Sequence, residues 1–399
     1  MLFFSLLLPY FLGNFYRPFL AVVAGDLSRE LGLDAAGLAS LQAAFLLAFA
    51  VTQVPVALSL DRLGPLRILI LSLASAVAGG VLLSVSFQPW HATLAMALLG
   101  AGFSPVMMAG FYFIGRAYPP ERFATLSSML FGFGMLGDPL SGSPLTLAVE
   151  AFGWRPTMFG MAAVTAFSLL LIVLVLRDPA RVEAPGGRVT ALDATKQVLA
   201  IRPLWFLVPV AFISYAPVAA VRGLWIAPYL EKVHGYSAHD VGLAATVMGL
   251  AFALGAVFYA PLNRMLGDAK ISVAAGLAVT VVAWIVLGLF GAASGALALT
   301  LLLIAASFGA GAAILLAHTR AFLPSHLVGQ GVTMINLLFF VGAALAQWLS
   351  GRYVKAAELA AVAPDVIYGT LFVAFGIVLA VSLIIYMFAP RERSASQEP

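Results

Sequence analysis

Three ionisable side chains lie deep inside apolar stretches of the sequence. Arg17 follows the segment LGNFY, Arg222 lies within AAVRGLW, and Asp138 interrupts the glycine-rich run GFGMLGDPLSGSP. A charged side chain at the centre of a bilayer costs about 2.5 to 3.5 kcal/mol on insertion scales, so such a residue faces a partner or a cavity. A guanidinium presents a planar fork of donors that fits a carboxylate, sulfonate, phosphate or nitrate group. Two guanidinium groups against one carboxylate therefore predict a cavity that binds an anion.

The spacing of the two arginines predicts that they face one another slightly away from the midplane. They are 205 positions apart, close to the 204-residue offset between repeated loop motifs described below. Asp138 is then expected to respond to protons, or to act as a counter-ion that is released when substrate arrives. Three neighbours on the same segments complete the predicted substrate site: Asn14, Tyr215 and Trp225. The alternative is that Arg17 forms a structural bridge with Asp138 while Arg222 extends toward the membrane surface.

The residue content indicates an integral membrane protein. Of 399 residues, 62% are hydrophobic and 10% are charged, with a mean hydropathy of +1.04. The formal net charge of +4 reflects basic loops, not a nucleic-acid partner. No cysteine is present, and no phosphate-binding Gly-Lys-Ser/Thr loop or metal-ligand spacing of histidines is found. We therefore expect no enzymatic activity, no cofactor and no metal.

Twelve segments are long and apolar enough to cross a bilayer, which needs about 20 residues each. They are 3–24, 36–59, 66–88, 92–115, 124–148, 157–176, 204–229, 240–262, 271–291, 296–318, 330–350 and 366–389. The first lacks a basic leader and a cleavage site, so we expect a retained helix. Lys and Arg concentrate in alternate loops, which predicts that both termini are cytoplasmic. Arg greatly outnumbers Lys, and Ala and Gly are abundant, which suggests a bacterium with a GC-rich genome, so the expected location is the inner membrane.

A long polar connector divides these spans into two sets of six. We expect an N-terminal six-helix bundle over 1–176, a cytoplasmic linker over 177–203, a C-terminal six-helix bundle over 204–390 and a cytoplasmic tail over 391–399. The halves repeat one another, because GRAYPPERFAT after the fourth span matches TRAFLPSHLVG after the tenth at an offset of 204. SLDRLGPLR and PLNRMLGDAK match in the same order. Paired repeats of this kind are typical of secondary transporters.

The segment ALSLDRLGPLR resembles the loop motif of the major facilitator superfamily. The matching residues are Asp61, Arg62, Gly64 and Arg67, whereas Ala57 replaces the usual first Gly and Pro65 a common basic residue. FGWR at 152–155 is also typical of the superfamily. The resemblance implies twelve transmembrane helices in two pseudo-symmetric bundles, and a gating role in which the Asp-Arg pair holds the inward ends of neighbouring helices together.

These observations predict a monomeric secondary active transporter that moves a small, carboxylate-like organic anion across the lipid bilayer by alternating access, coupled to protons. Three alternatives stay open. A multidrug/proton antiporter is disfavoured because Met96 occupies the position of a buried arginine in that branch. A nitrate-type inorganic anion transporter would also use paired arginines, but its Gly- and Asn-rich signatures are not evident. A receptor or assembly factor that kept the fold without transporting would be expected to lose the gating motif.

Overall fold

The computed structural model describes residues 2–177, 191–324 and 327–390. At 57–63, 120, 124, 191, 192 and 194 the description is limited to the backbone. Every long regular element within these ranges is a helix. This agrees with a chain that must satisfy its backbone hydrogen bonds inside a bilayer. The predicted all-α membrane fold is confirmed.

Ten helical stretches of the described chain are long and apolar enough to span a membrane. They are α3 (Ala35–Leu63), α4 (Pro65–Ser84), α5 (Pro89–Phe103) with α6 (Val106–Ala117), α10 (Trp154–Val175), the stretch Val208–His234 that contains α12 to α14, α15 (Ala238–Leu266), α16 (Ala269–Phe290), α17 (Gly295–Phe308) with α18 (Ala312–Arg320), α19 (Val328–Leu359) and α20 (Pro364–Met387). Their outward faces carry large exposed apolar side chains such as Leu174 and Leu254. Such faces suit contact with lipid.

Two further spans are interrupted. The first consists of α1 (Leu2–Phe15) and α2 (Leu20–Leu31), which meet at an angle of 55°. The fifth is divided into α7 (Pro120–Met135), α8 (Gly137–Leu140) and α9 (Ser143–Phe152). Prolines at or near each break remove backbone donors, which interrupts the helix. With these two spans the architecture agrees with twelve crossings.

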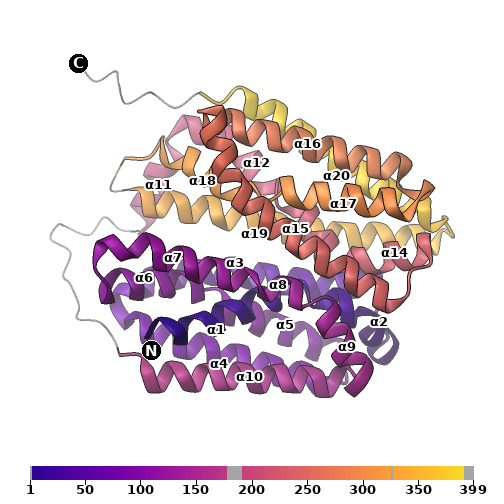
Figure 1. The fold of residues 1–399 in the computed structure, drawn as a ribbon, viewed down its shortest axis with the longest axis horizontal. Coiled ribbons are helices and arrows are strands. Elements are labelled where there is room, and N and C mark those ends of the chain that lie inside the picture. Colours follow the sequence, from indigo (N-terminus) through magenta and orange to yellow (C-terminus); the bar gives the residue numbers. More distant parts are fainter. Residues whose placement is uncertain (1, 178–190, 325–326, 391–399) are drawn as a thin grey trace.

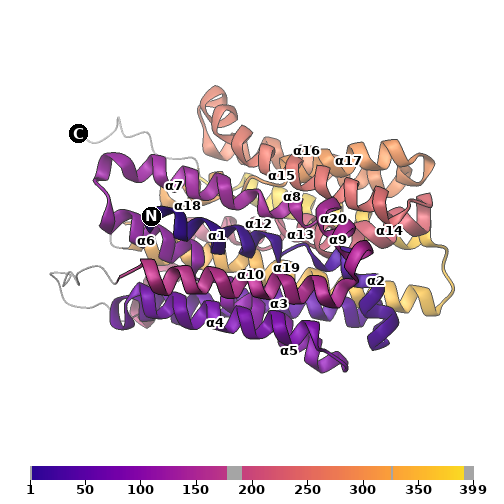
Figure 2. The same ribbon diagram turned by 60° about the horizontal axis from the view of Figure 1, so that its bottom comes forward.

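The helices of the two halves of the sequence form two groups that lie side by side. Helices α1 to α10 occupy one group and α12 to α20 the other (Figure 1). The start of α1 and the helices α6, α11 (Ala191–Leu199) and α18 lie at one end of the molecule, which we call the terminal end. Helices α2, α9 and α14 (Ile226–His234) lie at the opposite, distal end (Figure 2). Helix α11 falls inside the connector predicted at 177–203.

The two groups contact each other along two seams. Helices α3 and α19 run antiparallel, with Ala39 against Gly351 near the distal end and Gln53 against Asn336 farther toward the terminal end. Helices α8 and α9 pack on the distal part of α15. The predicted site residues lie between and beside these seams.

Candidate functional site

Arg17 lies at the break between α1 and α2. Because Pro18 follows it, the next turn is tightened, and the amide of Ala21 bonds to the Pro18 carbonyl at 3.1 Å. The carbonyl of Arg17 is instead bound by the side-chain amide of Gln42, at 2.7 Å from α3. The break therefore places a guanidinium in the interior and fixes its backbone to a neighbouring helix.

The Arg17 guanidinium is held by one amide and two aromatic rings. Its Nη1 donates to Asn14 Oδ1 at 3.2 Å, and its Cζ lies 4.9 Å from the ring centroid of Phe49 and 5.4 Å from that of Phe340. The buried Nε has no hydrogen-bond partner, and no carboxylate of the described residues lies within 4 Å of the side chain. Arg17 is thus an interior cation without an anionic partner in this part of the chain.

Arg222 lies in a π-helical turn, η2 (Val221–Trp225), between α13 (Ala216–Ala220) and α14. Such wide turns are frequent at functional sites. Its Nη2 forms an ion pair with Asp138 Oδ2, and both side chains are at least nine-tenths buried. The Arg222 Cζ also lies 4.4 Å from the ring centroid of Phe252 on α15. The pair joins the two halves of the molecule.

This pairing overturns the predicted alternative in which Arg17 and Asp138 form a bridge within the first half. Asp138 belongs to α8, whose four residues follow the first break in the fifth span. From there the carboxylate is directed toward α15, where a Cβ added to Gly249 would lie 2.8 Å from Asp138 Oδ1. Sequence periodicity could not reveal this direction, because the break changes the side of the helix on which the following residues lie.

Aromatic rings connect the two arginines. The ring of Tyr215 lies 5.8 Å from Phe340, which contacts Arg17, and 6.1 Å from Phe252, which contacts Arg222. Tyr215 occupies the break between α12 (Val208–Ile213) and α13, and its hydroxyl has no hydrogen-bond partner within the described ranges. The two guanidinium groups, predicted to face one another, are linked through Tyr215 and the two phenylalanines.

The α3–α19 seam encloses Arg17 between two polar layers. On the distal side Gln42 and Gln347 are almost fully buried, and the amide atoms Gln42 Oε1, Gln347 Nε2 and Gln347 Oε1 make no hydrogen bond to described residues. On the terminal side Asn336 Nδ2 donates to Gln53 Oε1 at 3.0 Å. Phe49 and Phe340 lie between these layers with ring centroids 4.5 Å apart. Along this seam a pair of polar side chains therefore lies on each side of Arg17, Gln42 and Gln347 on the distal side and Gln53 and Asn336 on the terminal side.

The second seam is closed by small residues at its distal end. A Cβ on Gly142 would lie 2.4 Å from Thr246 Oγ1, and one on Gly242 would lie 2.5 Å from Thr146 Oγ1. The Thr246 hydroxyl accepts from the amide of Ser143 at 2.7 Å and donates to the Pro139 carbonyl at 3.1 Å. We call these reciprocal contacts of α8 and α9 with α15 the distal seal.

Beyond the seal, a cavity of about 650 Å³ opens at the distal end. Side chains of α2, α9, the π turn and α14 line it, among them Glu150, Trp225 and Glu231. Nearby, Lys355 Nζ lies 2.7 Å from Asp34 Oδ2 and connects α19 to the loop before α3. The Lys355 ammonium and the amide of Gly37 hold the pKa of Asp34 below its ordinary value.

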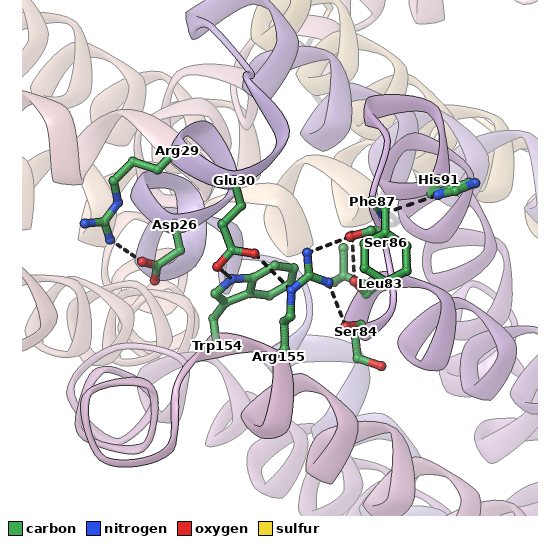
Figure 3. Close-up of polar contacts among 10 residues, drawn as sticks. All are labelled: Asp26, Arg29, Glu30, Leu83, Ser84, Ser86, Phe87, His91, Trp154 and Arg155. Atoms are coloured by element: carbon green, nitrogen blue, oxygen red, sulfur yellow. Dashed lines mark hydrogen bonds and ion pairs between the residues drawn. The ribbon is translucent and has the colours of Figure 1, made fainter.

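The FGWR motif anchors the distal end of the first half (Figure 3). Glu30 of α2 accepts from Trp154 Nε1 at 2.8 Å and from Arg155 Nε at 2.9 Å. The remaining Arg155 nitrogens donate to the carbonyls of Ser84 and Ser86, at 3.0 and 2.7 Å. One arginine thus connects α2, the end of α4 and the start of α10, which gives the motif a structural role.

The gating motif lies at the terminal end of α3. Gly64 adopts φ +82 between α3 and α4, a conformation that favours glycine and explains this position of the motif. Arg67 is exposed on the first turn of α4. The side chains of Asp61 and Arg62 lie outside the described atoms, so their gating role stays a prediction.

The structure gathers most of the predicted site residues around the two arginines and shows others that were missed. Asn14 is buried and holds Arg17, and Tyr215 lies between the arginines. Trp225 is buried with its Nε1 donating to Ser350 Oγ at 2.8 Å, so in this state it positions the π turn. The missed residues are the ring partners Phe49, Phe252 and Phe340. For Phe49 and Phe340 the signal was the seven-residue spacing from Gln42 to Phe49 and from Phe340 to Gln347, which places each pair on one helix face.

Comparisons with known proteins agree with the observed fold. A Mycobacterium tuberculosis protein with the name "Probable nitrate/nitrite transporter NarK2" is 27% identical over 251 residues, which cover 60% of this chain and 60% of that protein. The match thus spans less than two thirds of that relative. A bacterial homologue of the human lysosomal transporter Spinster, solved in an inward-facing and unoccupied conformation, has a TM-score of 0.75 at 18% identity, covering 97% and 96% of the two chains.

A D-xylose-proton symporter has a TM-score of 0.76 at 15% identity, covering 98% of each chain. At such low identities these solved structures show a shared fold. The family model described as "Major Facilitator Superfamily" matches residues 2–224, which is more than half of the sequence. The members of this family are membrane transporters and not enzymes. The chain belongs to the Major Facilitator Superfamily.

Proposed function

We propose that this transporter moves a small, carboxylate-like organic anion by alternating access. The observation that carries the proposal is the Arg17 guanidinium, which lies in the interior with an unbonded Nε and without a carboxylate partner among the described residues. An anion would supply the missing acceptors in a bidentate geometry. Asn14 and the two phenylalanine rings would hold the guanidinium in place, and the free Tyr215 hydroxyl would donate to the same ligand.

Arg222 would complete the anion site when Asp138 is protonated. A proton on Asp138 removes the charge that compensates Arg222, so the guanidinium becomes available to the substrate. When anion and proton leave on the other side, the Asp138–Arg222 pair forms again. Proton-coupled symport of a monovalent anion is therefore the proposed mode, and Asp138 is the coupling residue.

Nitrate is the second candidate substrate. It is planar and can accept from the same guanidinium fork, and the similarity to the nitrate/nitrite transporter named above favours it. The fifth span is rich in glycine but contains no asparagine, so the Gly- and Asn-rich signatures expected on the fifth and eleventh spans are not evident, which favours the organic anion.

We further propose that the terminal end faces the cytoplasm of a bacterial inner membrane, because the basic loops predicted to be inside lie there. The bundles expected over 1–176 and 204–390 would be the two bodies that move against each other in a monomer. Asp61 and Arg62 would then hold the cytoplasmic ends of neighbouring helices when the distal end is open.

The test is calorimetric binding of acetate, lactate, methanesulfonate and nitrate to the purified protein, followed by uptake into proteoliposomes with and without a pH gradient. Arg17→Lys should weaken anion binding roughly thirtyfold to a thousandfold, corresponding to about 2 to 4 kcal/mol, because an ammonium lacks the fork. Arg202→Gln, an exposed arginine outside the interior, is the matched control.

Near-wild-type binding by Arg17→Lys would contradict the anion site. Binding of tetraphenylphosphonium instead of any anion would indicate the multidrug antiporter, and anion binding without uptake would indicate a receptor. Uptake of nitrate but of no carboxylate would identify the inorganic anion as the substrate. Uptake that does not depend on the pH gradient would show that transport is not coupled to protons.

A further inference from the structure

Helices α19 and α20 diverge on the outer face of the second half and leave an apolar groove of about 590 Å³ between them. Helix α12 forms its floor, because Gly342 allows α19 to lie directly on the backbone carbonyl of Phe212. On the walls, Leu349 is 50% exposed and Val381 is 52% exposed. The groove thus opens sideways, on a surface of membrane-spanning helices that faces lipid.

The few polar groups of the groove are arranged unevenly along it. Ser350 and Ser382 are buried, and their hydroxyls bond to carbonyls of their own helices. The hydroxyls of Tyr353 and Thr370 have no hydrogen-bond partner in the described part of the chain. Each of these two residues lies six positions from the distal end of its helix, or about 9 Å at 1.5 Å per residue. The groove is therefore polar at its distal mouth and apolar toward the terminal end.

A cation lies beside this mouth. Arg352 follows Leu345 by seven residues and Leu349 by three, so it continues the lipid-facing stripe of α19. Its Cζ lies 4.9 Å from the ring centroid of Trp348, and no carboxylate of the described residues is within 4 Å. A tryptophan and an arginine at this level are typical of the interface between hydrocarbon and headgroups.

We propose that this groove binds one phospholipid of the distal leaflet. An acyl chain would lie between α19 and α20, and the phosphate would pair with Arg352. From Thr370 to Ile385 the groove runs about 22 Å along α20 at 1.5 Å per residue, which exceeds the roughly 15 Å depth of one hydrocarbon leaflet. The Tyr353 and Thr370 hydroxyls lie at the level where they can donate to ester carbonyls.

A lipid fits this surface better than a peptide or a polar solute. A peptide would leave backbone groups without partners in an apolar, laterally open groove, and a polar solute would find acceptors and donors only at the mouth. The site does not depend on the transported substrate. It does touch the candidate site, because Ser350 in its α19 wall accepts the hydrogen bond from Trp225, the last residue of the π turn that carries Arg222.

The test is native mass spectrometry of protein extracted from membranes in mild detergent, which counts the phospholipids that each molecule retains. Ala374→Trp fills the groove from α20, and Ala163→Trp places the same side chain on the lipid-facing surface of α10 as a matched control. We expect wild type and Ala163→Trp to retain one phospholipid, and Ala374→Trp to retain at least tenfold less. Arg352→Gln should lower retention several-fold.

Added phosphatidylglycerol in detergent micelles should raise the melting temperature of wild type and Ala163→Trp but not of Ala374→Trp. If Ala374→Trp does not fold, Val378→Trp fills the groove from another position of α20, where the native side chain is 50% exposed. Equal retention in the groove-filling and control variants would overturn the proposal. So would retention of detergent alone in the wild-type groove.

Discussion

Asp138 of α8 and Arg222 of the π turn form a buried ion pair that connects the two halves of the molecule. The two residues come from the fifth and seventh spans, and each lies where its helix is interrupted. In the proposed mechanism this charge pair acts as a coupling element between the two bundles, because protonation or ligand binding changes its strength.

Replacing Asp138 by Asn should destabilise the anion-free protein and strengthen its response to anions. Breaking one side of a buried pair costs about 3 to 5 kcal/mol, since it leaves an uncompensated charge. Thermal unfolding should show a lower melting temperature for Asp138→Asn and a larger increase on adding acetate than wild type shows. The double variant Asp138→Asn/Arg222→Gln should recover part of the stability. Identical melting curves for wild type and Asp138→Asn would exclude the coupling role.

Enlarging either glycine of the distal seal should keep the distal end open. A Cβ at Gly142 or Gly242 would meet a threonine hydroxyl at 2.4 or 2.5 Å, so valine forces α9 and α15 apart. Because the chain has no natural cysteine, a cysteine introduced at Phe252, which contacts Arg222 on the interior side of the seal, reports access from the distal end. Its reaction with maleimide should accelerate in Gly142→Val and Gly242→Val. Gly160→Val is the control, as nothing lies within 4 Å of that position, and equal rates in all three variants would refute the seal.

Removing the hydrogen bond between Asn336 and Gln53 should favour opening at the terminal end. A neutral hydrogen bond contributes about 0.5 to 1.5 kcal/mol, so Asn336→Ala should shift the equilibrium between the two access states roughly two- to twelvefold. Distance measurements between spin labels at the terminal ends of α3 and α19 would detect the shift. Asn336→Ala and Gln53→Ala should not be additive, and full additivity would show that the two side chains act separately.

The contact between Asp34 and Lys355 should stabilise the closed distal end at neutral pH and fade in acid. The pKa of Asp34 lies below its ordinary value, so the pair stabilises the folded state above that ordinary value, and the contribution is lost as the pH falls through the lowered pKa. Both side chains are nearly half exposed, which limits the effect to less than about 1 kcal/mol. The melting temperatures of wild type and Lys355→Gln should differ slightly at pH 7 and converge in acid. A constant difference would contradict the assignment.

Much of the architecture could be predicted from the sequence because bilayer physics acts on each span separately. Length and apolarity predicted the helical spans, and the cost of burying charge singled out Arg17, Asp138 and Arg222. Their partners could not be predicted, since the prolines and glycines around them change the direction of the helix. Phe252 was missed because nothing in the local sequence distinguishes it from the other phenylalanines among 29. For Phe49 and Phe340 the seven-residue spacing to a glutamine indicates a shared helix face, but it does not show what that face contacts. Only the antiparallel register of α3 and α19 brings Phe49 and Phe340 to the same level.

The imbalance of interior charges has an electrical consequence. Among the described residues, Arg17, Arg222 and Asp138 give the interior one net positive charge. In the proposed mechanism the interior would carry the same charge when a monovalent anion and a proton are both bound. Reorientation would then move equal charge in both directions, and a complete cycle would generate no steady current across the membrane. Anion transport without a proton would move one negative charge per cycle, driven by a membrane potential worth about 2.3 kcal/mol per 100 mV. Currents recorded from proteoliposomes adsorbed on a solid-supported electrode would therefore show whether a proton accompanies each transported anion.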